Sequence, residues 1–111
     1  MYIWLHRAYA GALNANVWLR QRAYLFMLSR RRHRLAHADL SYLNLQGIDL
    51  RGADLRHANL HHADLRDARL AGADLSGADL SLADMTEGQL DEVRSLEGAT
   101  LPDGTIFIGE R

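Results

Sequence analysis

Leucine recurs at every fifth position from residue 36 to residue 85. The column of leucines consists of Leu40, Leu45, Leu50, Leu55, Leu60, Leu65, Leu70, Leu75 and Leu80, and Met85 takes the tenth place. Two positions before each of these residues stands a second apolar residue, which is alanine in most units and Leu43 or Ile48 in two of them. The repeat runs through ten units without an insertion, so it indicates one continuous structure over residues 36–85.

A period of five fits neither an α-helix nor a flat strand. Five residues turn an α-helix by about 500°, so the leucines would scatter around its axis. On a strand, a step of five changes the face each time, and half the leucines would be exposed. Each unit must therefore turn the chain so that its leucine returns to a shared axis. This predicts a solenoid, with a narrow interior that accepts little more than a methyl group beside each leucine.

The units, such as AHADL, RGADL and SGADL, resemble the pentapeptide-repeat family, whose unit is A(D/N)LXX. The resemblance implies a β solenoid in the form of a right-handed quadrilateral β-helix with about four units per coil. Residues twenty positions apart would then stack on one face. His37 is expected to lie against His57, and Tyr42 against His62 and Leu82.

The segments on either side are expected to cover the ends of the solenoid, since open ends expose apolar core and unpaired backbone. Residues 1–35 form an N-terminal segment for which an imperfect apolar stripe over residues 2–28 predicts one or two helices. Residues 86–111 form a C-terminal cap, in which Thr86 and Gln89 have the spacing of a capping box and predict a helix over 87–95 lying on the last coil. Residues 98–101 read as one more degenerate unit, and residues 105–108 have the composition of a strand.

Charge is distributed unevenly along the chain. Residues 1–35 contain seven arginines and no acidic residue, whereas residues 36–85 and residues 86–111 each have a net charge of −4. The N-terminal segment also contains more aromatic residues than a single cap needs, and this excess indicates a partner-binding surface. The candidate partner-binding residues are Trp4, Arg7, Trp18, Arg20, Arg22, Phe26, Arg30, Arg31, Arg32 and Arg34.

Catalytic chemistry is not indicated. The Asp or Asn before each leucine is expected to accept hydrogen bonds from nearby backbone N–H groups, as in Asx-turns, rather than to act as an acid or base. Neither a nucleophile with its base nor a phosphate-binding loop is readable, and no cofactor is expected. Histidines along one edge make a metal site conceivable, but a solvated polar edge is the favoured interpretation.

These features favour a non-enzymatic protein–protein interaction or scaffolding module whose N-terminal segment docks into a larger assembly. A homo-oligomer remains open, and an acidic protein partner is favoured over nucleic acid. Two alternatives remain. Some members of the family that the repeat resembles protect DNA gyrase by mimicking DNA, and the aromatic and arginine residues would also suit a subunit peripheral to a membrane. With no secretory signal or spanning segment evident, we expect a cytoplasmic protein, with peripheral membrane contact left open.

Overall fold

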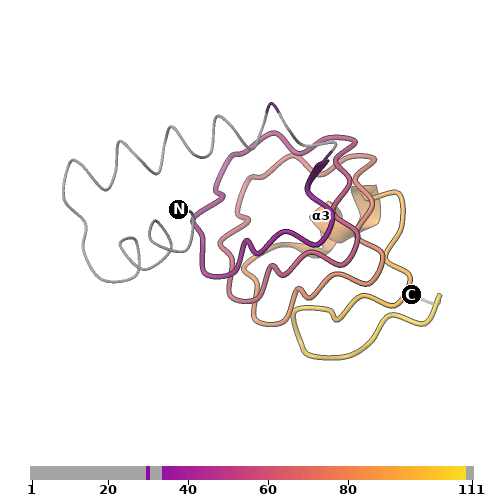
Figure 1. The fold of residues 1–111 in the computed structure, drawn as a ribbon. Helices are drawn as coiled ribbons and strands as arrows, with labels where there is room; N and C mark the ends of the chain where they lie inside the picture. Colours follow the sequence, from indigo (N-terminus) through magenta and orange to yellow (C-terminus); the bar gives the residue numbers. More distant parts are fainter. Residues whose placement is uncertain (1–29, 31–33, 110–111) are drawn as a thin grey trace.

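A stack of coils forms the body of the protein in the computed structural model, which describes Arg30 and residues 34–109 (Figure 1). Most of the expected N-terminal helical segment, residues 1–35, lies outside the described residues. Its helices therefore stay a prediction. Arg34 and Leu35 lead directly into the first coil, where the Leu35 N–H donates to the Asp54 carbonyl at 3.1 Å.

Parallel bridges join residues twenty positions apart and set the dimensions of each coil. Asp39 pairs with Asn59, Asn44 with Asp64, Asp49 with Arg69, and Asp54 with Asp74. Four units of five residues therefore complete one coil, which confirms a β-helix-type solenoid with four sides. Each rung is a pair of short hydrogen bonds: the Leu40 N–H donates to the Asn59 carbonyl at 2.7 Å, and the Asn59 N–H donates to the Ala38 carbonyl at 2.8 Å.

The leucine column fills the interior as predicted. The nine leucines of the column, Leu40 to Leu80, are at most 1% exposed. The alanines two positions before them, from Ala53 to Ala78 in steps of five, are at most 5% exposed. Burying one such leucine contributes about 1.5–3 kcal/mol, so the column is the main source of stability. Leu43 and Ile48 take the alanine position in the first coil, which no described coil covers on its outer side, and there the larger side chains are also buried.

A tight turn at each corner allows the chain to change direction every five residues. The N–H of the residue two before each leucine donates to the carbonyl of the preceding leucine, as from Ala63 to Leu60 at 3.0 Å. The third residue of each turn has positive φ, between 58° and 74° from His37 to Leu82. Glycine takes this position in four of the ten turns, and residues with a side chain take it in the other six. This left-handed conformation costs an L-residue about 1–2 kcal/mol, so these six turns are held by the ladder on both sides.

The C-terminal helix is shorter than predicted. The helix α3 spans Glu87–Glu92, rather than 87–95, and the capping box between Thr86 and Gln89 is present as expected. Val93 is extended (φ −72°, ψ 154°) because the chain there returns to the ladder, where the Arg94 N–H donates to the Ala73 carbonyl. Bridges then join Asp74 to Ser95 and Asp79 to Thr100, twenty-one positions apart. α3 therefore replaces one side of the third coil rather than lying across its end.

The Gln89 side chain compensates for the backbone that α3 removes from the ladder. Its Nε2 donates to the carbonyls of Leu65 at 2.7 Å and Ala68 at 3.0 Å, while its Oε1 accepts from the Thr86 N–H at 2.8 Å. Arg69 is the residue twenty positions before Gln89, in the preceding coil. Its backbone N–H donates to the Ile48 carbonyl and forms the rung that α3 lacks. One amide side chain therefore caps the helix and stands in for the missing rung.

The chain after the third coil folds back as a hairpin. Thr100 pairs with Asp79 on one side and antiparallel with Ile106 on the other, which confirms that residues 98–101 form a further unit. The Phe107 N–H donates to the Ala99 carbonyl at 2.8 Å, so the segment expected to be strand-like does pair with the ladder. Phe107 packs against the core, whereas Ile106 and Ile108 are exposed.

Alanine at Gly52 and at Gly88 should change stability in opposite directions. Gly52 has φ +68° and nothing within 4 Å of an added Cβ, so Gly52→Ala adds only the left-handed strain and should lower the free energy of unfolding by about 1 kcal/mol. Gly88 lies in α3 without positive φ, and Gly88→Ala should raise it by about 0.5–1 kcal/mol. Urea unfolding followed by circular dichroism measures both. Changes of the same sign in the free energy of unfolding of the two variants would contradict the described turn geometry.

The role of Gln89 is tested by Gln89→Glu, which keeps the acceptor for the Thr86 N–H and removes the donors to Leu65 and Ala68. Because each lost bond contributes about 1 kcal/mol, we expect a loss of about 2 kcal/mol in the free energy of unfolding. Glutamate is otherwise the standard capping-box residue, so a purely local helix cap would leave stability unchanged. The control Glu92→Gln, at the exposed end of the same helix, should stay within about 0.5 kcal/mol of the wild type.

Candidate interaction surfaces

One side of the solenoid carries all four described histidines on its two corners. We call it the histidine face: its ladder residues are Asp39, Asn59, Asp79 and Thr100, and its corner residues include His37, Tyr42, His57, His61 and His62. The coils that bring these residues together are stacked in Figure 1.

On the first corner, the rings of His37 and His57 stack with centroids 5.1 Å apart and an angle of 16° between their planes. Gly77 continues this column, and the His57 ring lies so close to it that an added Cβ would clash with His57 Nδ1. The expected stacking of His37 on His57 is therefore confirmed. The glycine in the next coil leaves room for the imidazole.

On the second corner, Tyr42 stacks on His62 with centroids 5.1 Å apart and an interplanar angle of 13°. His61 meets both rings edge-on, at 5.5 Å from Tyr42 and 5.1 Å from His62. Tyr42 is 46% exposed and Leu82, in the next coil, is 60% exposed. This corner therefore presents an aromatic and apolar strip to the solvent.

His61 also belongs to a chain of hydrogen bonds that ends on a carboxylate. Its Nδ1 lies 2.7 Å from Ser81 Oγ, and that hydroxyl donates to Asp79 Oδ1 at 2.5 Å. Because the single hydroxyl proton points to Asp79, the His61 Nδ1 must be the donor to Ser81. A serine nucleophile requires the opposite direction, with histidine accepting the hydroxyl proton. The three residues therefore fix the imidazole in place and do not activate the serine.

The Ser81 contact also affects the carboxylate. The hydrogen bond from the Ser81 hydroxyl is the main cause that lowers the pKa of Asp79, with the Ser81 N–H and the charge of His61 adding to it and burial opposing it. Ser81 was not among the residues predicted from the sequence. The spacing of twenty between His61 and Ser81 was the signal for it.

The other sides carry paired aspartates and arginines. Nε and Nη2 of the arginine bond both carboxylate oxygens in Asp49–Arg51, Asp54–Arg56 and Asp64–Arg66, at 2.7–2.9 Å. The same aspartates accept from the N–H of the residue two positions later, as the Asx-turn interpretation predicted. Arg94 adds a contact to Asp74 in the coil before it, at 3.0 Å. Sequence reasoning did not identify these pairs, although Asp-Leu-Arg spacing repeats three times.

Ionised carboxylates result from this pairing. The hydrogen bond from the Arg56 side chain lowers the pKa of Asp54 to about 2, and the pKa of Asp64 is lowered for the same reason by Arg66. The pKa of Asp74 is lowered mainly by the Ser76 hydroxyl. These carboxylates are poorly suited to donate protons near neutral pH.

Metal binding by the histidine edge finds no support in the described part of the chain. Over Arg30 and residues 34–109, no three His, Asp or Glu side chains lie close enough to hold a metal ion. The imidazoles contact one another as stacked or edge-on rings instead of converging on one point. Nor does any described helix have the length and hydropathy to cross a membrane.

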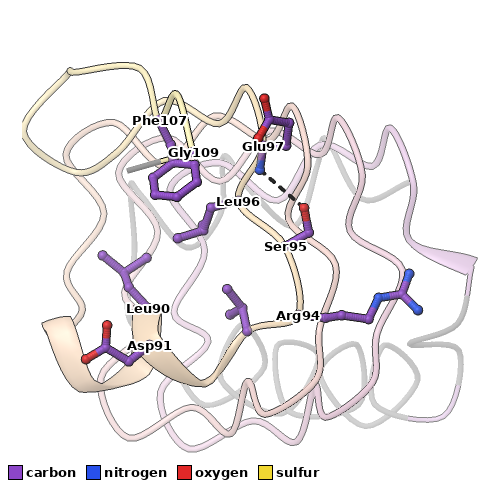
Figure 2. Close-up of a pocket in the computed structure, with 9 residues that line it drawn as sticks. Leu90, Asp91, Arg94, Ser95, Leu96, Glu97, Phe107 and Gly109 are labelled. Carbon is purple, nitrogen blue, oxygen red and sulfur yellow. Dashed lines mark hydrogen bonds between the residues drawn. The ribbon is translucent and has the colours of Figure 1, made fainter. Parts of the chain in front are cut away.

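A hollow of about 360 Å³ lies at the C-terminal end of the stack, and we call it the C-terminal groove (Figure 2). Leu90, Val93, Leu96 and Phe107 supply its apolar lining, and Asp91 and Glu97 are exposed beside it. In Figure 2 the side chain of Arg94 extends away from this lining. It is directed to Asp74. The remaining lining residues are Ser95 and Gly109.

Only two of the predicted partner-binding residues fall within the described part of the chain. Arg30 and Arg34 are both exposed, as a docking surface requires. The other eight lie outside the described residues: Trp4, Arg7, Trp18, Arg20, Arg22, Phe26, Arg31 and Arg32. Their role stays a prediction.

The family model of pentapeptide repeats matches residues 34–72 and 63–94, with eight copies of the repeat. This match covers more than half of the chain. Together with the twenty-residue register of the ladder, it shows that the chain belongs to the pentapeptide repeat family.

Two solved structures from the cyanobacterium Nostoc are similar to this chain. HetL from Nostoc sp. strain PCC 7120, a pentapeptide repeat protein involved in heterocyst differentiation regulation, is 38% identical over 62% of this chain and 43% of its own, with a TM-score of 0.27. The pentapeptide repeat protein alr5209 from Nostoc PCC 7120 is 33% identical over 71% of this chain and 74% of its own, with a TM-score of 0.25. The match to HetL thus spans less than half of that protein. Curated protein sequences gave no significant match.

The low pKa of Asp54 predicts how stability depends on pH. Its value of about 2 lies below the ordinary 3.8, so between these limits the unfolded chain binds the proton more readily. The free energy of unfolding should therefore fall as the pH drops from 4 to 2. Asp54→Asn keeps an oxygen for the Arg56 N–H but cannot titrate, so its stability should fall less steeply over this range. Acid unfolding curves of both chains test this; identical slopes would contradict the described pairing.

Proposed function

We propose that the protein is a non-enzymatic protein–protein interaction or scaffolding module, in which a right-handed, square-sided β-helix carries an N-terminal docking segment. The observation that carries this proposal is that, among the described residues, the core is formed by the coils and the C-terminal region. The cluster of buried apolar residues runs from Leu35 to Ala99. The tryptophans and most of the arginines of residues 1–34 are thus additional to the leucine and alanine columns of the coils.

The described surfaces support binding rather than chemistry. Arginine, serine and backbone donors lower the pKa of four ladder aspartates, Asp54, Asp64, Asp74 and Asp79. The Ser81–His61 contact on the histidine face points away from nucleophilic use. The Tyr42–His62 strip and the C-terminal groove instead offer exposed aromatic and apolar groups on a rigid body. Aromatic groups of this kind are enriched in protein interfaces.

DNA mimicry is the weaker alternative. A DNA mimic needs rows of carboxylates that present their charge to the solvent. Here Asp49, Asp54 and Asp64 share their charge with the exposed guanidinium groups of Arg51, Arg56 and Arg66. The solenoid therefore presents alternating charge over these sides.

Changes confined to the N-terminal segment should abolish partner binding. We expect a chain lacking residues 1–28, and the full chain with Trp4→Ser and Trp18→Ser, to lose the proteins that co-purify with the wild type from its native cells. The reason is that these aromatic residues would supply the desolvated anchors of the interface. Native purification with mass spectrometry measures the loss.

The control for this experiment is the full chain with Gln46→Ser and Asp67→Ser, which alters exposed corner residues of the solenoid. It should retain the same partners. Retained binding in both N-terminal variants, with normal circular dichroism, would reject the proposed docking segment. Protection of gyrase by the wild-type chain in a supercoiling assay would instead favour DNA mimicry.

A further inference from the structure

We propose that the C-terminal groove receives the N-terminal segment, residues 1–35, of a second copy of this chain, so that copies associate head to tail. The inference rests on the proposed function, because the same N-terminal segment is the docking element. It adds the identity of one partner and the site on that partner. Three observations on the described residues support it.

The first observation is an open edge of the ladder. It lies on the side of the solenoid whose ladder residues are Asp54, Asp74 and Ser95. There the Ala53 carbonyl and the Leu55 N–H both bond to Asp74 in the next coil. The equivalent groups in the third coil flank Ser95: they are the Arg94 carbonyl and the Leu96 N–H. Neither has a backbone partner among the described residues. The hairpin reaches only the neighbouring side, where the Gly98 N–H donates to the Phe107 carbonyl. These two groups can therefore bond polar groups of a docked partner.

The second observation is the apolar lining directly beside this edge. Leu90, Leu96 and Phe107 line the hollow together in Figure 2, on the same end of the molecule as Ser95. Ile106 and Ile108 add exposed apolar surface to that end, with exposures of 56% and 77%. The occupant must therefore contribute apolar or aromatic side chains as well as polar groups. Residues 1–35 are rich in both kinds, including Trp4, Trp18 and Phe26.

The third observation is charge complementarity. The described C-terminal region, residues 86–109, contains five acidic residues and one arginine, and that arginine, Arg94, pairs with Asp74. Asp91 and Glu97 stand exposed at the groove itself. The occupant should be basic and free of acids, and residues 1–35 carry seven arginines and no acid. Within this chain, that composition is confined to the N-terminal segment.

The arrangement of the ends fits a second copy as the source of the segment. Leu35 enters the first coil on the same side as Ser95, three ladder steps or about 14 Å from the groove. To reach its own groove, the segment would have to run back along the outside of that side. In a coaxial neighbour, Leu35 lies at the end of the stack that faces the groove. Such a contact joins different surfaces of the two copies and leads to open chains of copies.

The test uses the full chain, which contains no native cysteine. Two single-cysteine variants, Arg22→Cys and Glu97→Cys, are mixed under mild oxidation, and the cross-linked mixed dimer is quantified. We expect several-fold more of this dimer than when Arg22→Cys is mixed with the control Asp67→Cys, at an exposed corner of the second coil. In parallel, the sedimentation coefficient of the wild type should increase with concentration, and added salt should reduce this increase by screening.

Several outcomes would overturn the inference. One is a wild type that stays monomeric at all concentrations. Another is a Glu97→Cys chain that cross-links to itself more readily than to Arg22→Cys, because that would mean contact between two C-terminal ends. A third is an internal disulfide in the double variant Arg22→Cys/Glu97→Cys, which would show that the segment occupies its own groove. If any of these is found while the N-terminal variants still lose their co-purifying proteins, the proposed function stands and only the second copy is excluded as the partner.

Discussion

The return of the backbone to the same place after every twenty residues is the constraint on which this structure depends. It brings each leucine above another leucine and each ladder residue above another ladder residue. Because each rung consists of short hydrogen bonds between adjacent coils, the backbone polar groups are satisfied while the interior stays apolar. The six positive-φ residues with side chains are tolerated for the same reason, since the ladder holds both sides of each corner.

The same return determines the surface. Side chains twenty residues apart are neighbours, so the sequence controls the surface column by column. This is how His37 contacts His57, and how Ser81 comes to hold His61. Residues two apart across the junction of consecutive units are also neighbours, and they form the aspartate–arginine pairs. The side chains described above on the outside of the coils therefore contact neighbours in their own or the adjoining column. The C-terminal groove lies where these columns end.

The repeat alone allowed the ladder, the core and the aromatic columns to be predicted, because each follows from a single period. The capping box at Thr86 was also readable, since it is a local pattern. What the sequence did not reveal depends on contacts between non-repeating parts. The end of α3 at Glu92 is determined by the pairing of Arg94 with Ala73, and the double use of the Gln89 amide requires carbonyls twenty-one and twenty-four residues earlier. The C-terminal groove was likewise not predictable, because Phe107 reaches it through a hairpin whose partner strand the sequence does not specify.

The corner positions also limit which insertions and deletions of repeat units preserve the surface contacts. Adding or removing a whole coil would leave every column in phase. Adding a single unit between Leu70 and Ala71 would preserve the leucine core but rotate all later corners by a quarter turn. Ser81 would then move off the side that holds His61, and the Asp79–Ser81–His61 chain would be broken without any loss of buried apolar surface. The number of units between two surface residues is therefore under tighter restraint than the fold itself requires.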